Sequence, residues 1–178
     1  MIIKSYEINK IDLKESKFFL LYGKNEGYKN EVSNLLTKNN KISRLEEKEI
    51  LENENSFLED LLNKSLFDEK KTIIIKKVSD KIINIIEKIH SKNLEDILII
   101  INSENLEKKS KLRSFFEKNK ALVCIPFYPD NDQTLSKLAY NFLRDKKISI
   151  SPSNINLVIN KCNGDRETLL NELQKIEY

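Results

Sequence analysis

The sequence has few of the residues that build metal centres, disulfides and sharp turns. Its 178 residues include three glycines, three prolines, two cysteines, one histidine and no tryptophan. Cys124 and Cys162 lie far apart and form no CxxC pair, which argues against a disulfide scaffold and a structural zinc site and favours a reducing cytosol. With a single histidine, a His-centred catalytic triad or zinc centre lacks the side chains that it needs.

Long apolar runs and a charge of one sign are also absent. The longest uncharged apolar run is Ile97–Ile101, far shorter than the roughly 20 residues of a membrane helix. Met1–Lys4 is followed by polar residues, so no signal peptide is predicted. We therefore expect a cytoplasmic protein without a membrane partner. The 31 basic and 28 acidic residues leave a net charge of +3, which alone does not indicate nucleic-acid binding.

Short apolar runs alternate with helical patterns along the first two thirds of the chain. The runs are rich in β-branched or aromatic residues and cover 18–22, 72–75, 97–101 and 122–125, with a weaker one at 42–45. Apolar residues at helical spacing fall in 25–38, 55–63, 81–92 and 108–118. Continuous apolar runs are typical of strands buried on both faces, so this alternation predicts an α/β fold: a parallel sheet with helices on both faces.

The pattern changes at Pro126–Pro129, after which no strand is predicted. One helix is expected over 133–145, a second after Ser151-Pro152, where serine caps and proline occupies the first turn, and a third after Gly164-Asp165. We predict an α/β domain at 1–128 and a small all-α three-helix domain at 129–178. The last helix stops at Tyr178 without a capping signal, which indicates a fragment of a longer protein.

The turn after the first strong strand, Gly23–Asn30, lies where phosphate-binding loops occur. A functional loop of this type needs G-x-x-x-x-G-K-[ST]. Here the glycines are one residue too close, Tyr28 replaces the lysine that should follow Gly27, and Asn30 offers no hydroxyl. The segment therefore predicts a tight strand-to-helix turn, and a P-loop ATPase with an atypical loop is the alternative.

The metal-binding half of a nucleotide site should follow a buried strand as Asp-Glu. The residues after Ile97–Ile101 are Asn102-Ser103-Glu104, without the aspartate that would hold Mg²⁺. The phosphate-binding loop and the metal-binding strand end each lack the residues that they need. We therefore predict the architecture of a nucleotide-binding domain without nucleotide binding. No catalytic residue, cofactor or metal ligand is assigned.

Two large apolar residues, Leu66 and Phe67, lie between a helix that ends near Asn63 and a strand that begins near Thr72. Connections usually avoid such pairs. The spacing leaves two interpretations open: the pair tucks under the edge of the sheet, or it is an exposed anchor for a partner's pocket.

Three other polar features have ordinary explanations. The acidic cluster at 46–54 is expected to be a solvated face. His90 ends an apolar helix and is expected at the surface or as a cap. The basic segment Lys108–Arg113 is also expected to be a solvated helix face, and a DNA-binding module that uses it is a second alternative.

The order of these features resembles one family, the delta subunit of the clamp loader of bacterial DNA polymerase III. The resemblance spans essentially the whole chain. It rests on the order of the following segments: Phe18-Phe19-Leu20-Leu21-Tyr22-Gly23 with the broken loop Gly23–Lys29, Ser65-Leu66-Phe67 before Lys70-Lys71-Thr72-Ile73-Ile74-Ile75, Leu98–Ile101 followed by Lys108-Lys109-Ser110-Lys111-Leu112, and Asn163-Gly164-Asp165 with Leu170-Asn171-Glu172-Leu173-Gln174-Lys175.

The resemblance implies an AAA+-like domain of the P-loop NTPase type that has lost ATP binding, a helical lid domain and a missing C-terminal collar. It implies binding and opening of the sliding clamp (beta) for loading onto primed DNA, with Ser65, Leu66 and Phe67 as the clamp-binding residues and a second contact around Phe57–Leu62. The other loader subunits (gamma/tau and delta prime) would bind through the collar, and DNA would be contacted indirectly. The chain would be no enzyme itself, and would belong to a DNA-directed DNA polymerase, a nucleotidyltransferase, by complex membership.

Overall fold

The computed structural model describes residues 1–10, 16–38, 40–62, 71–94 and 96–177. The elements in these ranges are, in chain order, η1 (Ser5–Lys10), β1 (Phe18–Gly23), α1 (Glu26–Leu36), β2 (Ile42–Glu46), α2 (Glu47–Glu52), α3 (Glu54–Leu62), β3 (Lys71–Lys76), η2 (Asp80–Ile82), α4 (Ile83–Ser91), β4 (Ile97–Ser103), α5 (Lys111–Lys118), β5 (Val123–Phe127), α6 (Asp132–Asp145), α7 (Pro152–Lys161) and α8 (Arg166–Glu177).

The strands form one five-stranded sheet in the order β2-β3-β4-β1-β5, and every neighbouring pair is parallel. All five predicted runs are strands, including the weak one at 42–45, and β4 and β5 continue for two residues beyond the predicted ends. β5 continues through Pro126, which β5 tolerates because it is an edge strand of this sheet. The carboxyl ends of the strands lie at one edge, next to the start of α1.

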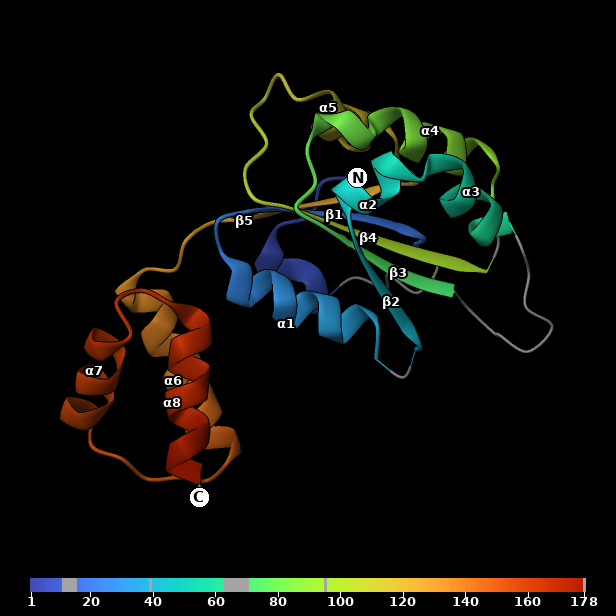
Figure 1. The fold of residues 1–178 in the computed structure, drawn as a ribbon. Coiled ribbons are helices and arrows are strands. Elements are labelled where there is room, and N and C mark those ends of the chain that lie inside the picture. The colour runs from blue at the N-terminus through green and yellow to red at the C-terminus, as the bar shows by residue number, and fades with distance from the viewer. Residues whose placement is uncertain (11–15, 39, 63–70, 95, 178) are drawn as a thin grey trace.

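Helices cover both faces of the sheet, as predicted (Figure 1). On β1, Phe18, Leu20 and Tyr22 face the cluster that is closed by α2, α3, α4 and α5. The alternate residues Phe19 and Leu21 face a smaller cluster with η1 and α1. Because β1 is apolar on both faces, it can lie in the interior of the sheet.

The amino terminus adds to the sheet, a contact that the sequence pattern did not indicate. Ile3 N donates to Cys124 O at 3.0 Å, and Cys124 N donates to Met1 O at 2.9 Å. Ile3 is buried among the residues that face α1. The first residues therefore pair in parallel with β5, along the side of that strand that faces away from β1.

Two helical predictions need correction. The helix expected over 108–118 begins at Lys111, because Ser110 Oγ accepts a hydrogen bond from Arg113 N and so caps it. The acidic cluster expected to be a solvated face spans the end of β2, the short helix α2 and the start of α3, and Glu49 and Glu52 are exposed as expected. Within it Glu47 is buried, and its carboxylate accepts hydrogen bonds from Ser79 N and Oγ at 2.8–3.0 Å.

The helices α6, α7 and α8 pack around an apolar cluster of their own, separate from the two clusters of the sheet. Ser151 Oγ accepts from Asn154 N and caps α7, whose first residue is Pro152, as the sequence predicted. We call α6–α8 the three-helix unit. Figure 1 shows it beside the carboxyl edge of the sheet, next to the start of α1.

Candidate functional site

The residues assigned to clamp binding, Ser65, Leu66 and Phe67, lie outside the described residues. The structure describes the chain on either side of them: α3 ends at Leu62, and β3 begins at Lys71. Lys71 Nζ donates a hydrogen bond to Asp60 O, so the two flanking elements are in contact.

The helices that precede this segment in the sequence carry acidic and partly exposed apolar side chains. We call residues 47–62 the α2–α3 surface. It carries one lysine and six acidic residues, of which Glu47 is buried, in a chain whose net charge is +3. Leu51 and Leu62 are 38% and 43% exposed. The predicted second contact around Phe57–Leu62 stays a prediction, but Phe57 and Leu61 cannot form it, because both are buried in the core under the sheet. Only Leu62 of that stretch offers a largely exposed apolar side chain.

The turn between β1 and α1 is tight, as the sequence predicted. Gly23 has φ +126°, a conformation that residues with a side chain rarely adopt. A Cβ at this position would lie 2.0 Å from Phe127 O. Gly23 is therefore required by the close approach of β5, and its role needs no ligand.

The amino end of α1 is capped by protein groups. Asn25 Oδ1 accepts from Tyr28 N at 3.0 Å, and Asn25 Nδ2 donates to Tyr128 O and Asp130 Oδ2 at 3.0 and 2.8 Å. Lys29 is 1% exposed; its Nζ donates to Glu26 Oε1 at 2.5 Å and to Ser103 O at 2.8 Å. Lys29, to which the sequence alone assigned no role, thus joins the start of α1 to the end of β4.

The neighbouring strand ends carry no Asp-Glu pair. Asn102 and Ser103 close β4; both are buried, and Ser103 Oγ donates to Val78 O at 2.6 Å. β3 ends at Lys76, and Lys77 follows with its Nζ 2.6 Å from Glu46 Oε1. The ends of β3 and β4 therefore present amide, hydroxyl and ammonium groups. Glu26 and Glu104 line the hollow beside them, but they are not the Asp-Glu pair that holds Mg²⁺ beside a phosphate.

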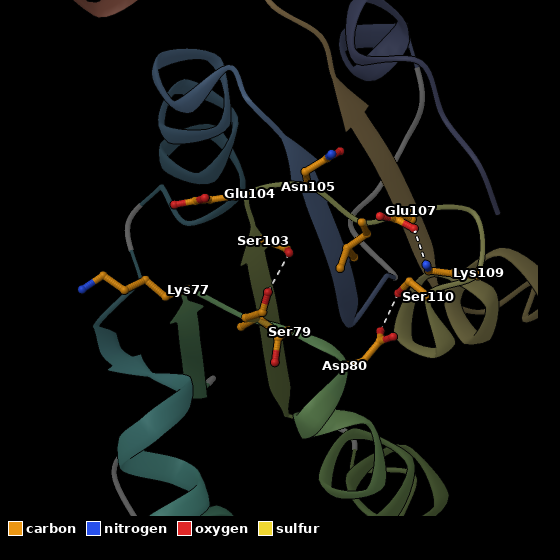
Figure 2. A pocket seen from close by; sticks show the side chains of 11 residues that line it. Lys77, Ser79, Asp80, Ser103, Glu104, Asn105, Glu107, Lys109 and Ser110 are labelled. Atoms are coloured by element: carbon orange, nitrogen blue, oxygen red, sulfur yellow. Dashed lines mark hydrogen bonds and ion pairs between the residues drawn. The ribbon is translucent and has the colours of Figure 1, made fainter.

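A cavity of about 590 Å³ lies along the same edge, between the ends of β3 and β4 and the start of α5 (Figure 2). Asp80 forms part of its wall and accepts hydrogen bonds from Ser110 Oγ and from the N–H groups of Lys111 and Leu112. Partial burial would raise the pKa of Asp80, but these donors together hold that pKa below its ordinary value. The Asp80 carboxylate therefore adds to the capping of α5 by Ser110.

The basic segment Lys108–Arg113 is divided between two environments. Lys108, Lys109 and Lys111 are exposed. Arg113 donates to Glu117 Oε1 at 2.7 Å and lies 5.0 Å from the centre of the Tyr22 ring, so its charge is neutralised within the protein. Lys109 pairs with Glu107 at 3.0 Å. The segment is not a row of free cations.

An ion cluster that sequence reasoning missed joins the three-helix unit to α1. Arg166, the first residue of α8, contacts Glu31 on α1 and Asp130 before α6, and its guanidinium lies 4.0 Å from the centre of the Tyr28 ring. These residues are far apart in the sequence, and no local spacing marks them as partners.

The remaining chemical groups have structural roles. Within the described residues there is no cluster of three His, Cys, Asp or Glu side chains that could hold a metal ion. Cys124 and Cys162 are buried and free, and burial raises the pKa of Cys124 to about 12. His90, expected at the surface or as a cap, is half-buried in the last turn of α4, and its ring packs edge-on against Phe18 and Phe115. In the same part of the chain, no helix has both the length and the apolar composition for crossing a bilayer.

The comparisons with solved structures identify the fold. The clamp loader delta protein of Bacillus subtilis (YqeN) superimposes with a TM-score of 0.65 at 17% identity, over 97% of this chain. Two replication initiation proteins are less similar: domain III of DnaA from Thermotoga maritima (TM-score 0.48, 14% identity, 93% of this chain and 76% of that chain) and AMPPCP-bound DnaA from Aquifex aeolicus (0.46, 15%, 87% and 55%). No protein-family model and no curated protein matches the sequence.

This chain spans 57% of the length of the clamp loader delta protein that it matches. The sheet order, the helices on both faces and the three-helix unit all fall within the superimposed region, since 97% of this chain is covered. The predicted α/β fold is thus confirmed: the chain has the parallel sheet, covered by helices on both faces, of a clamp loader delta protein.

Proposed function

We propose that this chain is part of a clamp-loader delta subunit, which binds a ring-shaped sliding clamp through Ser65, Leu66 and Phe67 and helps to open the ring for loading onto primed DNA. The observation that carries the proposal is the superposition on a clamp loader delta protein over 97% of this chain. The protein would work in the cytoplasm with the other loader subunits, within the DNA polymerase III holoenzyme. Residues 1–128 and 129–178 would be its first two domains.

The carboxyl edge of the sheet supports a role without nucleotide chemistry. Where phosphates bind a strand-to-helix turn, N–H groups at the helix start and a lysine are available to them. Here Asn25 accepts from Tyr28 N, and Lys29 Nζ is held by Glu26 and Ser103 O. A subunit with this edge would not hydrolyse ATP itself, so other subunits of the loader would supply that step.

The α2–α3 surface supports a protein-binding role beside the proposed clamp-binding residues. Leu51 and Leu62 are exposed there, and the acidic side chains around them favour a partner with a basic rim. Burial of Leu66 and Phe67 in an apolar pocket would give roughly 3–6 kcal/mol of gross transfer free energy. Association costs several kcal/mol, so contacts from this surface would have to contribute as well.

Ring opening requires that the subunit bind the open clamp interface more tightly than the closed one. Two adjacent apolar anchors would supply most of the affinity, because a few central residues usually dominate an interface. The difference between the two states of the clamp would then arise from the rim around those anchors.

The test is a calorimetric titration of this chain against the sliding clamp of the same organism. Leu66→Ala/Phe67→Ala should abolish binding while the circular dichroism spectrum and melting temperature stay those of the parent. A matched control is Tyr140→Ala/Leu157→Ala, which removes two exposed apolar side chains from the three-helix unit and should leave binding unchanged. Equal affinity of the parent and the Leu66/Phe67 variant would remove these residues from the proposal.

The two alternatives are tested by separate ligands. A P-loop ATPase would be stabilised by ATP and Mg²⁺ through mass action, and would show a rise in melting temperature. A DNA-binding module using Lys108–Arg113 would show DNA affinity that falls steeply with salt. We expect neither response, because Lys29 and Arg113 are both paired within the protein.

A further inference from the structure

The contact between the three-helix unit and α1 is built around one buried arginine. Arg166 Nε donates to Glu31 Oε2 at 3.0 Å, and its Nη2 lies 3.0 Å from the same oxygen. Its Nη1 lies 3.4 Å from both carboxylate oxygens of Asp130. The guanidinium therefore joins α8 to two acidic groups outside it, and its plane lies over Tyr28.

Burial makes this cluster sensitive to the loss of one member. The side chains of Arg166 and Asp130 are 10% and 7% exposed, whereas Glu31 is 47% exposed. Among the described residues, removing the arginine would leave the buried Asp130 carboxylate with two neutral donors, Asn25 Nδ2 and Thr134 Oγ1. A buried charge without its partner is unfavourable, so the docked arrangement would lose its main stabilising contact.

The same network reaches the amino end of α1. Asp130 accepts from Asn25, the residue that caps α1, at 2.8 Å. The backbone of Glu167 packs against Gly27, where an added Cβ would lie 3.0 Å from Glu167 N. The start of α8 thus lies directly over the first turn of α1, the place where a phosphate would bind in a strand-to-helix loop.

We infer that Arg166, Asp130 and Glu31 form a clasp that fixes the three-helix unit on the sheet in one orientation without any nucleotide. The first turn of α1 is covered by the protein's own side chains and by α8. The orientation of the three-helix unit relative to the sheet therefore does not depend on a bound nucleotide. The geometry also assigns distinct roles: Arg166 is the positioning residue, Asp130 its buried counter-charge, and Gly27 allows the close approach. The inference does not depend on clamp binding.

The test measures the distance between the two parts of the chain by pulsed electron resonance. Spin labels on Glu87→Cys in α4 and Asn156→Cys in α7 lie at exposed positions, and the two native cysteines are buried. The otherwise unchanged chain should give one narrow distance distribution, identical with and without saturating ATP and Mg²⁺. Arg166→Ala should broaden or shift that distribution while the circular dichroism spectrum keeps its helical content.

Arg144→Ala is the matched control, because Arg144 lies in the three-helix unit, is 72% exposed and pairs only with its neighbour Asp145 among the described residues. It should leave the distribution unchanged. Glu31→Gln provides a milder variant in case Arg166→Ala fails to fold, and it should broaden the distribution less. Three results would overturn the inference: a broad distribution in the parent, a shift on adding ATP, or narrow distributions in both clasp variants.

Discussion

The carboxyl edge of the sheet and the α2–α3 surface differ in which side chains they leave exposed to a partner. At the carboxyl edge, Asn25, Lys29 and Asp80 are each satisfied by neighbouring groups of the same chain. On the α2–α3 surface, Leu51 and Leu62 are exposed among acidic side chains. In the first region, which has the topology of a ligand site, these three polar groups hydrogen-bond within the chain. The second region also pairs charges internally, Lys48 with Glu52 and Glu54 with Lys88, but it leaves two apolar side chains exposed. The fold of this chain therefore does not by itself indicate where a partner or ligand binds.

The largest effect on the carboxyl edge is expected from Gly23→Ala. The added Cβ would lie 2.0 Å from Phe127 O at a φ of +126°, so β1 and β5 would have to separate locally. We expect the free energy of unfolding to fall by about 3 kcal/mol, measured by urea denaturation. Gly164→Ala is the control, since φ is +81° there with no atom within 4 Å, and it should cost only about 1 kcal/mol. Equal losses would show that steric contact with Phe127 is unimportant.

Lys29→Met tests whether the buried lysine is a structural group. The substitution keeps an unbranched side chain but leaves the buried Ser103 carbonyl without the ammonium donor. The free energy of unfolding should fall by about 1–3 kcal/mol. Lys24→Met, at an exposed position on the same turn, should change it by less than about 0.5 kcal/mol. A more stable Lys29→Met protein would instead mark the lysine as a group retained for binding at the expense of stability.

Asp80→Ala removes a side chain that caps α5, and its effect should depend on pH. At neutral pH the loss should be about 1 kcal/mol, as for other helix caps. Because the folded-state pKa of Asp80 is lowered, its contribution is complete above the unfolded pKa of about 3.9 and is lost as pH falls through the folded value. Urea denaturation curves of parent and variant should therefore converge in acid. Asp145→Ala, whose side chain is 68% exposed, should show little difference at any pH.

The smallest effect on stability is expected on the α2–α3 surface. Leu62 is 43% exposed, so Leu62→Ser should change the free energy of unfolding by no more than about 0.5 kcal/mol. Affinity for the clamp should nevertheless fall by about threefold, a small loss, because residues around the central anchors of an interface each contribute little. Leu157→Ser, which alters a more exposed leucine in the three-helix unit, should leave affinity unchanged. If both variants bind like the parent, the α2–α3 surface takes no part in the contact.

The sheet could be predicted from the sequence because its strands carry a local signal. Runs such as Phe18–Tyr22 and Ile97–Ile101 are apolar on both faces, which is typical of strands inside a parallel sheet. Helix bounds were less accurate where a polar residue caps the helix in the middle of an apparently helical pattern, as Ser110 does. The short α2 was not predicted, because it is mostly charged and its one buried apolar residue, Ile50, gives no helical hydrophobic pattern.

The polar contacts of the site could not be predicted, because their partners are distant in the sequence. Arg166 pairs with Glu31, and Lys29 pairs with Ser103 O, and neither spacing leaves a local pattern. Glu47 looked like one charge in a solvated cluster, yet it accepts from Ser79. The assignment of Ser65, Leu66 and Phe67 came from order and resemblance, lies outside the described residues and stays a prediction.

The strand order also has a consequence for how this chain folds. β1 is made first among the strands but pairs only with β4 and β5, so it has no partner in the sheet until the chain has reached residue 103. β2 and β3, by contrast, are neighbours in both sequence and space. Closing a long loop is entropically costly, so pairings of high sequence separation form slowly. During synthesis, Phe18–Tyr22 would thus remain an exposed apolar segment until late, which makes it the part of the chain most in need of protection from aggregation.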